Sequence, residues 1–161
     1  MKEKTYKCSF ACCPYKDKII QPEDLVENGK KKMHKECAKN SENMLKIKTL
    51  YYEKVSNTVV MSQLVKVIKD IITLKKVDSD YFYFALKYAV DNKMKINSPY
   101  GLHYLIDNNR IKMAWKEKRS AEIANEIKEQ ERNTIIQPNA NTFNYSLEVS
   151  SGFGNILKGG Q

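Results

Sequence analysis

The chain has 161 residues, of which 42% are hydrophobic and 29% are charged, a globular composition that excludes wholesale disorder. No apolar run approaches the roughly 18 residues of a membrane-spanning helix. The formal net charge is +9, and only three of the 28 basic residues are arginines (Arg110, Arg119 and Arg132). A lysine-dominated field favours phosphates or acidic partners without reading nucleotide sequence, although the same excess can serve solubility alone.

The cysteines are confined to the N-terminal end of the chain. The first residues contain no apolar signal core, so we expect a protein that is not secreted, in which disulfides are a poor explanation for cysteines. One of the two histidines lies among them, and the group comprises Cys8, Cys12, Cys13, His34 and Cys37. Three thiolates and one imidazole make a closed tetrahedral set for structural zinc.

Either Cys12 or Cys13 can be the second ligand of this set, because a knuckle can form with three or four residues after Cys8. We favour Cys13, with Cys12 as a filler residue, so the expected zinc ligands are Cys8, Cys13, His34 and Cys37. Glu36 invites comparison with the His-x-Glu signature of zinc deaminases, but the second cysteine pair of that signature is missing. With four protein ligands available, we expect no catalytic zinc and no enzyme.

The residues between the ligands predict a small fold around the ion. Asn28-Gly29 is a turn signal between two short extended pieces, residues 24–27 and 30–33. His34 and Cys37 are three residues apart, so one helical turn directs both side chains toward the same ion. The expected order is therefore knuckle, hairpin and helix.

The segment from Lys7 to Lys39 resembles a treble-clef finger of the LIM-half type. It is also similar to small zinc-finger proteins of phages of Gram-positive bacteria, in which a GKKxxHxxC stretch opens a helical body. The first cysteine pair departs from the LIM-half pattern, which has two intervening residues. The resemblance covers about the first 40 residues and implies a structural, binding role without chemistry, in a phage-encoded protein of the bacterial cytoplasm.

Lysines surround the expected ligands and are candidate contacts to a phosphate backbone. They are Lys7, Lys30, Lys31, Lys32 and Lys35. The alternative for the lysine run is a solvated hairpin strand.

Residues 45–132 predict a helical body, since turn-forming residues are scarce. A first helix should start near His34 and run to about Met44, and residues 45–55 either continue it or form a second helix. Apolar residues recur at helical spacing over residues 60–76, where β-branched content leaves a strand as the alternative.

Two further helices are expected after this segment. Asp78 to Asp80 offer capping oxygens for a helix whose aromatic run, Tyr81 to Phe84, belongs to the core or forms a base-stacking surface. Ser98 is the expected N-cap of the next helix, with Pro99 at its first position. That helix is either continuous to Arg132 or broken near residues 107–110. Its charged distal half projects from the body or packs on a partner.

Residues 133–161 form a polar tail with little charge. Apolar and polar residues alternate in it over residues 143–149, which is typical of a strand. This strand can pair with the finger's hairpin or with the sheet edge of a partner protein, or it can stay disordered until such a partner binds. The expected partner-binding residues are Phe143, Tyr145, Leu147 and Phe153.

Together these observations predict a mainly α protein with a zinc-finger module (residues 1–44), a helical bundle (45–132) and a partner-binding or disordered tail (133–161). The expected function is non-enzymatic nucleic-acid binding through lysine-rich surfaces, with structural zinc as cofactor and no membrane partner. The alternative is an adaptor or inhibitor that targets a host replication, transcription or defence protein. The oligomeric state is left open.

Overall fold

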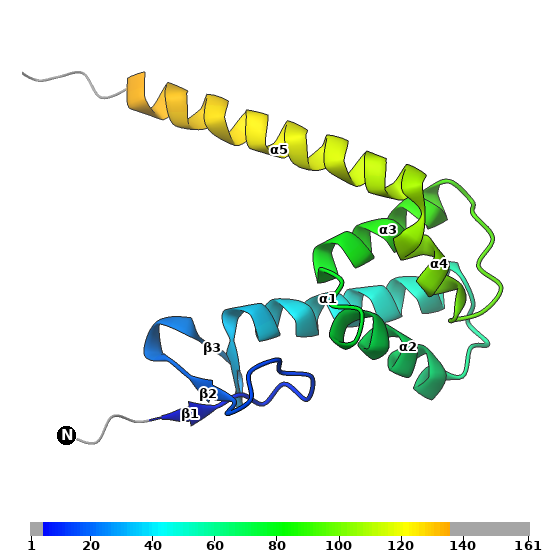
Figure 1. Cartoon of the computed structure of the whole chain (residues 1–161), viewed down its shortest axis with the longest axis horizontal. Helices are drawn as coiled ribbons and strands as arrows, with labels where there is room; N and C mark the ends of the chain where they lie inside the picture. The colour runs from blue at the N-terminus through cyan, green and yellow to red at the C-terminus, as the bar shows by residue number, and fades with distance from the viewer. Residues whose placement is uncertain (1–4, 136–161) are drawn as a thin grey trace, which may run out of the picture. The chain divides into compact units, whose positions relative to one another are not determined.

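The structure, a computed structural model, describes residues 5–135, and it is mainly helical with paired strands at its N-terminal end (Figure 1). The N-terminal elements are β1 (Tyr6–Lys7), β2 (Ile19–Ile20), the 3-10 helix η1 (Pro22–Asp24), β3 (Leu25–Asn28) and β4 (Lys31–His34). The helices are α1 (Lys35–Lys54), α2 (Met61–Thr73), α3 (Ser79–Asp91), α4 (Gly101–Asp107) and α5 (Asn109–Ile135). The predicted fold class is confirmed for the described residues.

The predicted hairpin is formed by β3 and β4, which pair antiparallel with Leu25 opposite His34. Each strand lies one residue later than expected. Gly29 in the turn has φ of +61°, a left-handed conformation that glycine adopts without steric cost. The antiparallel pair β1 and β2 was not expected, because two-residue strands are too short to show alternation.

Helix α1 is a single element that belongs to two separate hydrophobic cores. Cys37, in its first turn, is buried in a small core with Cys8, Phe10, Ile20 and Met33. Farther along, Ile47 and Tyr51 are buried in the main core of the helices. Met44 packs against both cores, so the boundary expected after residue 44 falls inside one continuous helix.

The main core is built from α1 to α4 and the start of α5. Helix α2 directs one apolar face into it, as the helical spacing predicted, and the strand alternative for this segment is wrong. The fully buried side chains of this core include Ile47, Tyr51, Leu64, Ile68, Ile71, Phe82, Leu86, Leu102 and Ile111. Burial of Phe82 confirms core packing for part of the aromatic run.

Side-chain caps set two of the helix starts. The Asp78 carboxylate accepts hydrogen bonds from the backbone N–H groups of Asp80 and Tyr81, at 2.7 and 3.1 Å, and caps α3 as predicted. Asn108 caps α5 by accepting from Arg110 N, and it marks the predicted break between α4 and α5.

The expected cap at Ser98 is wrong. The carbonyl of Ser98, not its side chain, accepts from Gly101 N at 2.9 Å, so residues 98–101 form a turn before α4. Pro99 therefore lies in this turn and not at the first helical position.

The described chain contains one compact unit through Glu122, and its remaining described residues, 123–135, belong to a second unit. We call the part of the first unit that follows Cys37, through Glu122, the helical body. None of the helices among residues 5–135 combines the length and apolar content needed to cross a bilayer. The strand expected over residues 143–149 and the candidate residues Phe143, Tyr145, Leu147 and Phe153 lie outside the described residues.

Candidate metal centre

All four expected ligands come together in the N-terminal module, which we define as residues 5–37. The thiol sulfurs of Cys8, Cys13 and Cys37 and a ring nitrogen of His34 all lie within 4.8 Å of one another. Zinc–sulfur bonds of about 2.3 Å in a tetrahedron place two sulfurs roughly 3.8 Å apart, so this spacing suits a central ion. Cys12 is outside the group, so Cys13 is the second candidate ligand, as expected.

Three separate segments deliver these side chains. Cys8 follows β1, and its N–H donates to the Lys18 carbonyl at 2.7 Å, while Cys13 N donates to Phe10 O at 3.2 Å and closes the knuckle. His34 ends β4, and Cys37 lies one turn into α1. The start of α1 is fixed from outside the helix by Asp24, whose carboxylate accepts from Lys35 N at 3.0 Å.

The orientation of the His34 ring is determined by a backbone carbonyl. Its Nε2 lies 2.9 Å from Ile19 O, and because a carbonyl only accepts, Nε2 must carry the proton. In the neutral ring this leaves the lone pair on Nδ1, which lies 3.6 Å from both Cys13 Sγ and Cys37 Sγ. Metal-binding histidines are held by the same kind of hydrogen bond through their second nitrogen.

The environment of the cluster lowers the pKa of one thiol and raises the pKa of another. Burial alone would raise the pKa of Cys8, but hydrogen bonds, first those from the backbones of Phe10 and His34, outweigh burial and lower the pKa to about 7. The pKa of Cys37 is raised by burial and then by its hydrogen bonds with Cys13 and Cys8. Deprotonation is therefore favoured at Cys8 and disfavoured at Cys37. A divalent ion would balance the charge that full deprotonation creates.

An exposed aromatic ring covers one side of the cluster. The Tyr15 ring packs on the His34 ring with 4.3 Å between their centroids, and its hydroxyl donates to Glu36 Oε2 at 3.2 Å. Hydrogen bonding to Glu36 is the main reason that the pKa of Tyr15 is raised. Glu36 is thus engaged with Tyr15 and is not among the clustered ligands.

Sequence reasoning missed both residues that position His34. Tyr15 lies two residues after Cys13, and its proximity to the knuckle is the only sequence signal that points to it. Ile19 acts through its backbone carbonyl, which leaves no trace in residue type.

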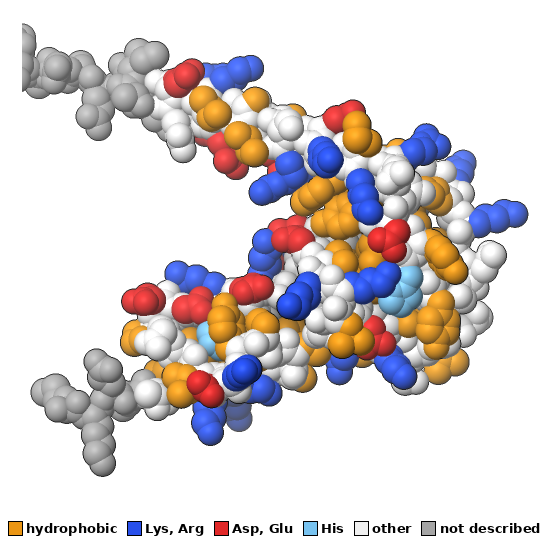
Figure 2. All heavy atoms as spheres, viewed as in Figure 1, with side chains coloured by type: hydrophobic (Ala, Val, Ile, Leu, Met, Phe, Trp, Pro, Cys, Tyr) orange, Lys and Arg blue, Asp and Glu red, His pale blue; other side chains and the backbone are white. Residues whose placement is uncertain are grey.

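The five candidate phosphate-binding lysines differ in their surroundings. Lys32 donates to Glu27 at 3.1 Å and lies 3.4 Å from the centre of the Tyr6 ring, so it is already engaged within the module. The other four are exposed and have no acidic partner among the described residues: Lys7, Lys30, Lys31 and Lys35. Figure 2 shows basic side chains gathered along the lower edge of the N-terminal module.

No family model matches the chain, and neither a curated protein nor a solved structure matches it. The function is therefore inferred from the residues of the chain itself.

Proposed function

We propose that the N-terminal module is a structural zinc finger and that the protein is a non-enzymatic nucleic-acid-binding protein. The observation that carries the zinc assignment is the convergence of three sulfurs and one imidazole nitrogen within 4.8 Å. Three thiolates with one imidazole form a soft donor set that suits zinc and disfavours magnesium or calcium.

The donor set supports a structural role for the ion. Catalytic zinc sites keep one position for water, whereas four protein side chains lie close enough here to supply all four ligands of a tetrahedral ion. Glu36, the carboxylate nearest in sequence to the ligands, accepts a hydrogen bond from Tyr15 on the outer side of His34. When bound, the ion would hold the knuckle, the hairpin and α1 together.

The exposed lysines of the module support nucleic-acid binding. Lys30 and Lys31 lie at the hairpin turn, Lys7 is in β1, and Lys35 begins α1. Because no carboxylate among the described residues pairs with them, their charge is available to phosphates. With three arginines in the chain, we expect modest base specificity.

The test compares two variants that remove the same charge. Lys30→Gln/Lys31→Gln alters the hairpin turn, and Lys66→Gln/Lys95→Gln, the control variant, alters exposed lysines in α2 and in the segment before α4. Affinity for a labelled oligonucleotide is measured against salt concentration. We expect the affinity to fall steeply as the salt concentration rises. In a plot of log affinity against log salt concentration, the hairpin variant should reduce the slope by about one for each phosphate that is no longer neutralised.

Two results would contradict nucleic-acid binding by the module. One is equal behaviour of the hairpin variant and the control variant. The other is an absence of binding at low salt, which would favour the alternative of a protein-binding adaptor.

A further inference from the structure

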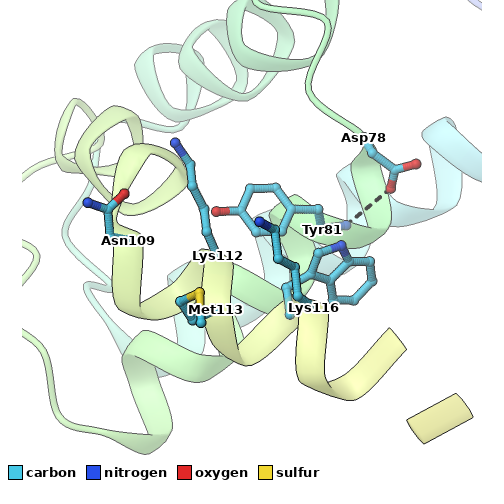
Figure 3. A pocket seen from close by; sticks show the side chains of 7 residues that line it. Asp78, Tyr81, Asn109, Lys112, Met113 and Lys116 are labelled. Carbon is cyan, nitrogen blue, oxygen red and sulfur yellow. Dashed lines mark hydrogen bonds between the residues drawn. The ribbon is translucent and has the colours of Figure 1, made fainter. Parts of the chain in front are cut away.

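A concave site lies in the helical body, and none of the four candidate metal ligands lines it. It is a pocket of about 440 Å³ between α3 and α5, a size within the usual range for small-molecule sites. Figure 3 shows that Lys112 and Lys116 approach Tyr81 from α5, while Asp78 lies at the start of α3. The lining residues are Asp78, Tyr81, Asn109, Lys112, Met113, Trp115 and Lys116.

Aromatic rings form a fixed wall of this pocket. The Trp115 ring packs against Phe84 and Tyr81, with centroid distances of 5.1 and 5.9 Å. The Tyr81 hydroxyl donates to the Ile106 carbonyl at 2.9 Å, which holds the ring in place and leaves its hydroxyl satisfied. A flat ring entering the pocket therefore meets a preformed surface and not a mobile side chain.

The charged side chains that line the pocket are two lysines and one aspartate. Lys116 has no acidic partner among the described residues, and Lys112 lies 3.9 Å from Asp107, which also binds Lys75 at 3.2 Å. Lys118 Nζ lies 5.4 Å from the centre of the Trp115 ring and 3.5 Å from Glu122 Oε1. The acidic lining residue, Asp78, uses one carboxylate oxygen to cap α3.

We infer that this pocket binds one base of a single-stranded nucleic acid, with the adjacent phosphates on Lys112 and Lys116. Aromatic stacking accepts any base, and lysines hold the backbone without reading sequence. The inference rests on the proposed nucleic-acid binding and adds to it a stacking site in the helical body. Part of the aromatic run thus packs in the core, as Phe82 does, while Tyr81 faces the pocket.

Trp115 is the only tryptophan in the chain, so its fluorescence reports on this pocket. Three probes are added to the zinc-loaded protein: a short oligothymidylate, an abasic strand of equal length, and thymidine monophosphate at millimolar concentration. We expect quenching by the first and third probes and little change with the abasic strand. Lys112→Gln/Lys116→Gln should weaken oligothymidylate binding about tenfold at low salt, and the control variant much less.

The probes separate failure of the pocket from failure of the proposed function. Strand binding is measured by fluorescence anisotropy. If the strand binds without quenching Trp115, and Lys112→Gln/Lys116→Gln binds it as tightly as the control variant, the pocket is overturned and the proposed function stays intact. Quenching by thymidine monophosphate without strand binding would support the pocket and contradict nucleic-acid binding by the protein. Neither quenching nor strand binding would overturn both.

Discussion

The ring of Tyr15 lies on the ring of His34, with 4.3 Å between the two centroids and an angle of 37° between their planes. Its hydroxyl donates a hydrogen bond to Glu36 in the first turn of α1, and this bond holds the loop that carries Tyr15 against the candidate ligand His34. The ring separates His34 from solvent on this side of the cluster.

Removal of the Tyr15 ring should expose the metal to competing chelators. We expect Tyr15→Ala to release zinc to a colorimetric chelator several times faster than the unaltered protein, because water and chelator reach His34 directly. Tyr15→Phe keeps the ring and is the matched control, with a release rate close to that of the unaltered protein. Equal rates for all three proteins would show that the ring does not shield the metal.

Removal of the metal should unfold the N-terminal module and spare the helical body. The module's core contains only five buried residues, and its strands have two to four residues, too little to be stable without a cross-link or ion. In ¹H–¹⁵N spectra recorded with excess chelator, we expect signals of residues 5–37 to collapse and those of α2 to α4 to keep their dispersion. Persistent dispersion of the module's signals would contradict a metal-dependent fold.

A buried polar network joins α1 to α3 and should contribute to the stability of the body. Asn43 Nδ2 donates to Ser79 Oγ at 2.9 Å and to Asp80 Oδ1 at 2.7 Å, and both Asn43 and Ser79 are buried. We expect Asn43→Ala to lower the free energy of unfolding by about 1–3 kcal/mol, since it leaves a buried partner unsatisfied. Urea unfolding followed by Trp115 fluorescence measures this loss, and Thr49→Ala, at an exposed position of the same helix, should change it little.

Asp80 should make the body sensitive to acid. Burial acts to raise its pKa, but hydrogen bonds from Lys39 and Asn43 outweigh burial and hold the pKa below its usual value of 3.8. A carboxyl group whose pKa is lower in the folded state stabilises the protein above its ordinary pKa and loses that contribution as pH falls through the folded value.

We therefore expect the free energy of unfolding to fall below about pH 4, and to fall less steeply in Asp80→Asn. Urea titrations of both proteins across this range, with Trp115 fluorescence as the readout, provide the comparison. Parallel pH profiles would indicate that Asp80 is not responsible for the acid sensitivity.

The sequence was most informative where chemistry restricts residue type. Cysteine and histidine spacing identified four ligand candidates that lie together, and Asn28-Gly29 located the hairpin because few residues adopt positive φ. Apolar spacing likewise found α2, since a helix buries one face at a regular period.

Other features depended on tertiary contacts that leave no local pattern. The pairing of β1 with β2 and the hydrogen bond from His34 to Ile19 arise from backbone groups. The choice between Cys12 and Cys13 was decided by the course of the knuckle, where Cys13 N bonds to Phe10 O. Trp115 and Tyr81 are distant in sequence, so the pocket they line could not be anticipated from spacing.

The most direct test of the metal centre uses the two adjacent cysteines, which are identical in type and differ in placement. Zinc per chain is measured by elemental analysis on the unaltered protein, Cys12→Ser and Cys13→Ser, each purified without added metal. We expect about one zinc per chain in the first two proteins and a large loss in Cys13→Ser, because only Cys13 belongs to the clustered ligands. Loss of zinc from Cys12→Ser with full retention in Cys13→Ser, or a folded and metal-free unaltered protein, would contradict the centre described here.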